Sequence, residues 1–138
     1  MTDDNLAAML NKNNAPFAKL MGVVMTNVTK TRIEGELKVT KDHCTIPDNM
    51  HGGAIMALAD NMGGIGAFLN MPEGAITTTV ESKTNFLRAI PMGQTAKAVT
   101  TPVNIGRQLQ LWKTEIFRDD GKLAAIVTQT QIILAPQT

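Results

Sequence analysis

The spacing of apolar residues changes along the chain and predicts where its helices and strands lie. Within residues 1–16 the apolar positions follow helical spacing until Pro16 interrupts them, which predicts a short amphipathic N-terminal helix. Over residues 22–40 apolar and charged positions alternate instead, which predicts a strand, or a hairpin, with one face in solvent. The apolar positions that carry these patterns are Leu6, Met9 and Leu10 in the helix and Ile33, Leu37 and Val39 in the strand.

Residues 53–69 are apolar or small at almost every position, and Asp60 is the only charged residue among them. A helix that is apolar on all sides is usually buried within protein. The preceding segment, residues 41–50, shows no periodicity and predicts a loop that leads into this helix. We therefore expect a sheet on one side of the helix and a second subunit on the other.

Four β-type segments follow the helix, over residues 75–90, 94–105, 108–117 and 123–134. Their connections are short, and the last has the hairpin chemistry of Asp119, Asp120 and Gly121, so the strands are expected to run antiparallel. An antiparallel sheet curled around one apolar helix is an α+β fold. The length of 138 residues fits a single domain over residues 1–138.

Charge and cysteine content exclude several classes of function. The 13 Lys and Arg residues nearly balance 12 Asp and Glu, with no run of like charge, so no nucleic-acid partner is expected. Cys44 is the only cysteine and only two histidines are present, which argues against a disulfide framework or a cysteine-rich zinc site. The chain begins with acidic residues and has no apolar run long enough to cross a bilayer, so we expect a cytoplasmic protein without a membrane partner.

The strongest local signal for chemistry is the run His51, Gly52, Gly53 at the expected start of the apolar helix, with Asp60 nine positions after the histidine. The first N–H groups of a helix have no partner within it, and the helix dipole adds partial positive charge, so they can hold an oxyanion or a polarised carbonyl. A carboxylate in apolar surroundings suits a general base or, when ionised, a nucleophile. The alternative is a structural carboxylate paired with a cation.

The spacing of these groups indicates a site shared between two chains. From Gly52 to Asp60 the helix rises about 12 Å, so one chain cannot bring both groups to the same reacting carbon. If the helices of two subunits lie antiparallel, the N-terminus of one approaches the middle of the other. We therefore expect a homo-oligomer, either a dimer or a dimer of dimers.

A resemblance to a known family rests on three segments that occur in this order: HGGAIMALADNMGGIGAFL, TVESKTNFLRAI and NIGRQLQLWKTEIFRDDGKLAAIVTQT. The resemblance covers roughly residues 23–134. These segments resemble the hotdog-fold thioesterases of the phenylacetate-degradation and hydroxybenzoyl-CoA type. The resemblance implies a curved antiparallel sheet wrapped around a central helix. It also implies hydrolysis of an acyl-CoA or aryl-CoA thioester, for which no metal or redox cofactor is needed because CoA is part of the substrate.

The resemblance also assigns roles to residues. It makes Asp60 the general base or nucleophile, the Gly52 N–H the group that polarises the thioester carbonyl, and His51 part of the same pocket. Thr45 stands where many relatives have Gln or Asn, a role that Asn49 could take over. The other positions implied to contact substrate are Gly53, Thr79 beside the attacking water, and Arg88 and Arg107 near the CoA phosphates.

Two other functions are compatible with the same residues. One is a non-catalytic module that binds or senses acyl-CoA, which the replacement at Thr45 favours. The other is a hotdog enoyl-CoA hydratase or dehydratase that uses His51 and Asp60 as an acid and base pair. The length of the acyl chain, and whether it is aromatic or aliphatic, stay open.

Overall fold

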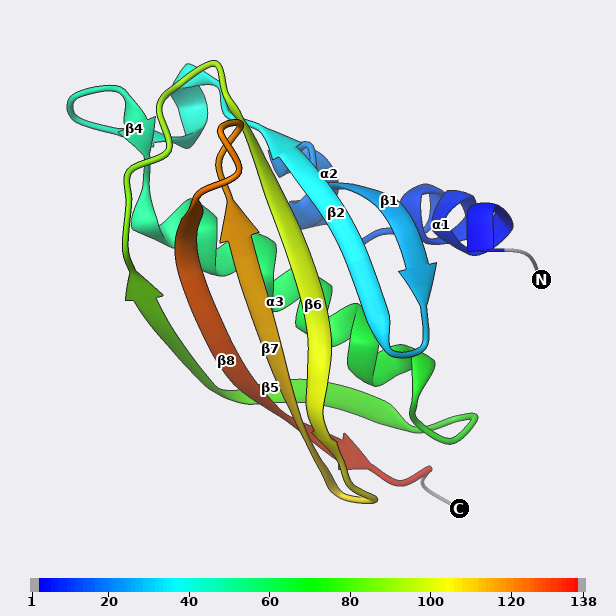
Figure 1. The fold of residues 1–138 in the computed structure, drawn as a ribbon. Coiled ribbons are helices and arrows are strands. Elements are labelled where there is room, and N and C mark those ends of the chain that lie inside the picture. The colour runs from blue at the N-terminus through cyan, green and yellow to red at the C-terminus, as the bar shows by residue number, and fades with distance from the viewer. Residues whose placement is uncertain (1–2, 137–138) are drawn as a thin grey trace.

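A computed structural model describes residues 3–136, in which one long helix packs against a six-stranded sheet. Figure 1 shows the helix, α3, lying across one face of the sheet. In chain order the elements are α1 (Asp3–Lys12), α2 (Pro16–Met21), β1 (Val24–Thr29), β2 (Arg32–Lys38), the 3-10 turn η1 (Lys41–His43), β3 (Cys44–Thr45), β4 (Asn49–Met50), α3 (Gly52–Leu69), β5 (Ile76–Phe86), β6 (Thr95–Ile105), β7 (Leu109–Phe117) and β8 (Leu123–Leu134).

The sheet has the strand order β1-β2-β6-β7-β8-β5, and every neighbouring pair is antiparallel, which confirms the predicted α+β class. The prediction that short breaks join the four C-terminal strands was wrong for the first connection. β5 ends at Phe86 instead of continuing to residue 90, and it pairs with β8 and not with β6. Residues 87–94 carry the chain from one edge strand to the middle of the sheet, as the ascending segment at the left of Figure 1 shows.

The alternating pattern in β2 places its apolar residues in the core, as predicted. Ile33 and Leu37 are fully buried, while Arg32 and Lys38 at the two ends of the strand are exposed. β1 precedes β2 and forms a hairpin with it, which settles the choice between a strand and a hairpin for residues 22–40. The predicted N-terminal helix is α1, but it already ends at Lys12, before Pro16. Pro16 begins α2 instead, because a proline fits the first turn of a helix.

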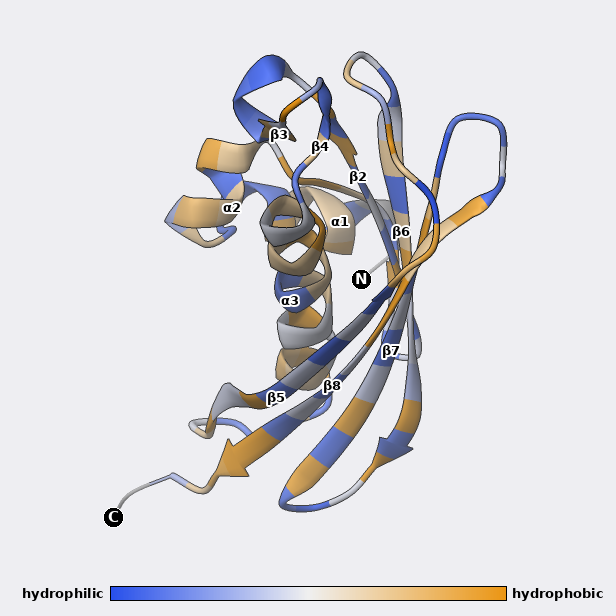
Figure 2. Cartoon of the chain, turned by 90° about the vertical axis from the view of Figure 1, so that its left-hand side faces the viewer, coloured by the Kyte–Doolittle hydropathy of each residue, from blue (hydrophilic) through white to orange (hydrophobic). Residues whose placement is uncertain are grey.

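The helix α3 is covered by the sheet on one side only within the described chain. Its sheet-facing residues, among them Leu58 and Met62, are fully buried, whereas Gly53, Asp60 and Phe68 are exposed. Figure 2 shows the sheet bending around α3, with α2 on the other side of the helix. This chain therefore covers one face of the helix with its sheet, as expected, and leaves residues of the other face exposed. Among the described residues, no helix is both long enough and apolar enough to cross a membrane.

Two glycines let α3 approach the sheet closely. A Cβ atom on Gly63 would lie 2.2 Å from the side-chain amide carbon of Gln129, and one on Gly66 would lie 2.9 Å from the ring of Trp112. Both contacts are too short for a real methyl group. Gly64, one position away, has open space where its Cβ would be. The sheet side of the helix therefore requires glycine, and the outer side does not.

These contacts predict opposite effects for two neighbouring substitutions. Gly63→Ala forces a methyl group into Gln129 and should lower the free energy of unfolding by about 2 kcal/mol. Gly64→Ala meets no atom and should leave stability unchanged or raise it by up to about 1 kcal/mol, because alanine favours a helix. Denaturant unfolding of both variants tests this, and equal stabilities would contradict the close approach.

Candidate active site

Asp60 lies in the middle of α3, and its side chain reaches toward the edge strand β5. Its Oδ1 accepts a hydrogen bond of 2.6 Å from Thr79 Oγ1 and a longer one of 3.3 Å from Gln129 Nε2. Among the described residues, no hydrogen bond or ion pair is made to Oδ2. Asp60 is exposed, so the chain by itself does not bury this carboxylate in an apolar helix. One oxygen is thus held, and the other has no protein partner among the described residues.

The hydroxyl that holds Asp60 belongs to a longer chain of hydrogen bonds. Thr79 Oγ1 accepts a 2.6 Å bond from Gln131 Nε2, and Gln131 Oε1 accepts a 3.0 Å bond from Thr77 Oγ1. The register of β5 against β8 explains this arrangement, because Thr79 pairs with Gln131 across the two strands. Gln129 and Gln131 are each only 1% exposed. Asp60 is therefore connected to buried polar groups on the last strand.

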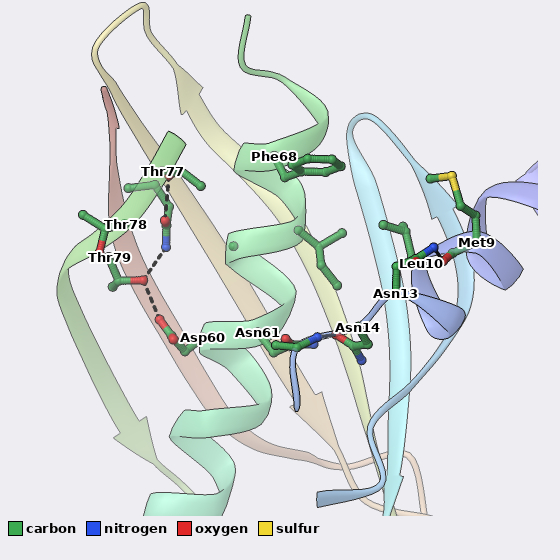
Figure 3. A pocket seen from close by; sticks show the side chains of 14 residues that line it. Met9, Leu10, Asn13, Asn14, Asp60, Asn61, Phe68, Thr77, Thr78 and Thr79 are labelled. Carbon is green, nitrogen blue, oxygen red and sulfur yellow. Dashed lines mark hydrogen bonds between the residues drawn. The ribbon is translucent and has the colours of Figure 1, made fainter. Parts of the chain in front are cut away.

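Asp60 opens onto a pocket of about 720 Å³, here called the Asp60 pocket. It crosses the outer face of α3, between β5 on one side and the end of α1 on the other, as Figure 3 shows. Met9, Leu10 and Phe68 give it apolar walls, and among the described residues that line it Asp60 alone is charged. Such a cavity can hold an apolar group beside the Asp60 carboxylate.

The N-terminus of α3 forms the second candidate region. His51 is the N-cap residue, and its Nδ1 accepts a 2.8 Å hydrogen bond from the Gly53 N–H. This bond occupies the Gly53 N–H. Among the described residues, no acceptor is found for the Gly52 N–H. Of the two glycines, Gly52 is thus the one whose N–H is available to a carbonyl oxygen.

A smaller pocket of about 410 Å³ lies at this helix end and brings together Thr45, Asn49, Gly52 and Arg88. Arg88 lies beyond the end of β5 and not within the strand where the sequence placed it, because β5 stops at Phe86. One of its guanidinium nitrogens donates a 2.8 Å hydrogen bond to the Leu123 carbonyl. Three of the predicted substrate-contacting positions therefore share one cavity.

Other predicted site residues lie apart within this chain. Gly52 and Asp60 line different pockets, and His51 lines a third with Gly53. Arg107 lies in the turn between β6 and β7, whereas Arg88 lies beside the start of β8, so the two arginines occupy opposite ends of the sheet. Within the described part of the chain, no three His, Cys, Asp or Glu side chains are placed to hold a metal ion.

The buried glutamines of β8 are not among the site residues predicted from the sequence. Along β8 the residues that face α3 alternate, and Val127, Gln129, Gln131 and Ile133 all occupy buried positions. Glutamine at two consecutive inward positions of an otherwise apolar strand is a signal that sequence could have provided, because buried amides need partners. The partners themselves come from β5 and α3 and are set by the fold.

Comparisons with known proteins agree with this fold and identify the family. The model of the thioesterase superfamily matches residues 48–125, a stretch that includes Gly52, Asp60 and Thr79. The proofreading thioesterase EntH of Cronobacter sakazakii is 30% identical over 103 residues, which cover 74% of this chain and 74% of that protein. The chain therefore belongs to the thioesterase superfamily and is a thioester hydrolase.

Solved structures show the same fold. A thioesterase of Haemophilus influenzae superimposes with a TM-score of 0.87 at 24% identity, over 100% of this chain and 94% of that one. The PaaI protein of E. coli, from the phenylacetic acid degradation operon, gives 0.85 at 19% identity, over 98% and 96%. A hypothetical thioesterase of Streptococcus pneumoniae solved with coenzyme A gives 0.76 at 19% identity, over 84% and 88%. The architecture is the hotdog fold, as the sequence resemblance implied.

The cap formed by His51 predicts a measurable structural role for this residue. His51→Ala removes the acceptor of the Gly53 N–H and should lower the free energy of unfolding by about 1 kcal/mol. His51→Asn should restore most of this loss, because asparagine is a favoured N-cap residue. Thermal or denaturant unfolding of the three proteins measures the effect. Equal destabilisation by both substitutions would show that the cap is not the source of the loss.

Proposed function

We propose that this thioester hydrolase acts on an acyl-CoA or aryl-CoA ester, with Asp60 as its general base or nucleophile. The observation that carries the proposal is the state of the Asp60 carboxylate. Its Oδ1 is held by Thr79, and Oδ2 has no partner among the described residues at the edge of an apolar pocket. A carboxylate so placed can attack a thioester carbon or take a proton from water.

The Gly52 N–H would complete the reaction centre. As the carbonyl carbon becomes tetrahedral, negative charge develops on its oxygen, and a helix N–H with no other acceptor stabilises that charge. The C–S bond then breaks, and the CoA thiolate takes up a proton that comes from water and leaves as the thiol. The acyl group leaves as a free acid that carries the oxygen of that water, either directly or after water hydrolyses an anhydride formed with Asp60. The proposed chemistry needs no metal or redox cofactor. His51 contributes by capping the helix and so orienting its first turn.

The two pockets suggest where each part of the substrate binds. The apolar Asp60 pocket is suited to the acyl or aryl group, and Thr79 lies at its edge, where the resemblance places the attacking water. The cavity beside Gly52 contains Asn49 and the positive charge of Arg88, which suit the thioester and the CoA phosphates. A structural neighbour solved with coenzyme A supports this class of ligand. Arg107 and Gly53 stay predicted contacts.

We infer that a second copy of the chain completes the site. Gly52 and Asp60 are about 12 Å apart along one helix, and they line separate pockets. The 11-residue strand β5 is an edge of the sheet, and Ile76, Val80 and Phe86 on it are large, apolar and exposed. Long exposed edges of this kind are usually covered. Antiparallel pairing through β5 would bring the two α3 helices together as a dimer or a dimer of dimers.

The first test is thiol release from a panel of CoA esters that includes phenylacetyl-, benzoyl-, acetyl-, butyryl- and palmitoyl-CoA. Asp60→Asn should lower kcat by about 100-fold or more with the oligomer intact, because it removes the base or nucleophile. Glu73→Gln is the matched control, since Glu73 is an exposed carboxylate in the turn before β5. The ester that is hydrolysed fastest also identifies the substrate class. That the protein acts in the cytoplasm stays a prediction.

Each other outcome of this assay favours a different function. Binding of the esters without turnover would favour an acyl-CoA sensor and would leave Asp60 as a structural carboxylate. Addition of water to an enoyl-CoA without release of thiol would favour a hydratase. Full activity of Asp60→Asn would exclude it as the reacting carboxylate.

A shared site predicts complementation between two inactive chains. Gly52→Pro removes the N–H and is compatible with the extended conformation of His51, whose φ and ψ are −64° and 139°. Mixed with Asp60→Asn, it should form hetero-oligomers with about half of the wild-type activity per pair, because one of two symmetric sites is intact. Gly52→Ala is the control that adds a Cβ but keeps the N–H. Inactive mixed oligomers of proven composition would contradict the shared site.

A further inference from the structure

The hydrogen bonds behind Asp60 have a direction that the structure fixes. A carbonyl oxygen can only accept, so Gln131 Oε1 accepts a hydrogen bond from the Thr77 hydroxyl. The other end of the amide, Nε2, then points toward Thr79 and donates to it. The Thr79 hydroxyl has one proton. Because its oxygen already accepts from Gln131 at 2.6 Å, that proton is free to point at Asp60 Oδ1, which lies 2.6 Å away.

We propose that Gln131, anchored by Thr77, is a positioning residue that makes Thr79 a dedicated donor to Asp60. This inference rests on the proposed role of Asp60 in thioester hydrolysis. Without Gln131 the Thr79 hydroxyl can rotate and donate to water in the pocket. With Gln131 in place, Oδ1 is held as an acceptor and the reactive lone pairs are confined to Oδ2.

The surroundings of the carboxylate restrict its rotation further. Gln129 Nε2 donates to the same oxygen, Oδ1, at 3.3 Å and to the Asp60 backbone carbonyl at 3.4 Å. Gln129 fits there only because Gly63 has no side chain. Among the described residues, Oδ1 has two donors and Oδ2 has none, which gives the two oxygens different roles. The direct contact of Gln129 is longer, so Thr79 is the main donor whose direction matters.

The fold supplies a matched control for Gln131 on the neighbouring strand. Gln110 pairs with Gln131 across β7 and β8 and is also 1% exposed. Its Oε1 accepts from the Trp112 indole, and its Nε2 donates to the Asn70 carbonyl, so it is not connected to Asp60. Loss of a buried glutamine amide can therefore be separated from loss of the connection to Asp60.

The kinetic test compares Gln131→Met with Gln110→Met in thiol release from the best ester of the panel. Gln131→Met should lower kcat about tenfold with little change in KM, because the carboxylate is misdirected while Gln131, which lines the Asp60 pocket, is only 1% exposed there. Gln110→Met should lose stability but keep kcat within about twofold. Thr77→Val, a milder change on the edge strand, should lower kcat about threefold. Equal kcat losses in Gln131→Met and Gln110→Met would overturn the proposal.

A double-mutant cycle tests whether Gln131 acts through Thr79. In a Thr79→Val background, Gln131→Met should change kcat by less than about twofold, since the hydroxyl that it orients is gone. In a Thr79→Ser background, which keeps the hydroxyl, the tenfold effect should return. A tenfold loss that persists in Thr79→Val would show that Gln131 acts by another route.

A measurement that does not need turnover separates this inference from the proposed function. In ¹H–¹⁵N spectra of wild-type protein, Gln131→Met and Gln110→Met identify the two side-chain amide signals by their disappearance. Asp60→Asn should shift the Gln131 signals and leave those of Gln110 in place, because of these two glutamines only Gln131 is linked to the carboxylate. Unmoved Gln131 signals would overturn the inference even in an active enzyme. Shifted signals in a protein that releases no thiol from any ester would instead count against the proposed function.

Discussion

The distance between α3 and the sheet is the constraint on which the site depends. Gly63 and Gly66 remove the methyl groups that would hold the helix away from β7 and β8, and the side chains of Gln129 and Trp112 fill the space. Asp60 precedes Gly63 by less than one turn, so this close approach also sets how far its carboxylate lies from the sheet. A hydrogen bond of 2.6 Å to Thr79 requires the strand and the helix backbone to be held at this separation. The geometry of the candidate site therefore depends directly on how the helix packs against the sheet.

Three buried glutamines interrupt the apolar layer between helix and sheet. A buried amide without partners costs several kcal/mol, whereas an apolar side chain of the same size would need no partner at all. Gln110 and Gln131 have partners for both ends of their amides, and Gln129 is bonded through Nε2 to Asp60. Two of the three connect to the one carboxylate of α3. For Gln129 and Gln131, the proposed orientation of Asp60 supplies a reason for a buried amide that stability alone does not give.

The sequence predicted those elements whose pattern is local. The apolar helix over residues 53–69 and the strand over residues 123–134 agree with α3 and β8 almost residue for residue, because a change of period marks their ends. The crossing from β5 to β6 was not predictable in this way. Residues 87–90 are as apolar as a strand, and only their position in the assembled sheet shows that they leave it. In the same way, α2 begins at Pro16, and a proline can either end or begin a helix.

The candidate site shows the same division between local and assembled information. Asp60 and Gly52 could be selected from sequence because a charge in an apolar helix and glycines at a helix start are local features. Gln131 could not be connected to Asp60, because the connection passes through the register of β5 against β8. The proposed pairing of two chains is likewise a matter of assembly that no local sequence pattern states. One chain holds Asp60 with a free oxygen and, about 12 Å along the helix, a Gly52 N–H with no acceptor among the described residues. Under the proposed mechanism each would be half of a reaction centre, and a second copy on the exposed face of α3 between them would bring the complementary half.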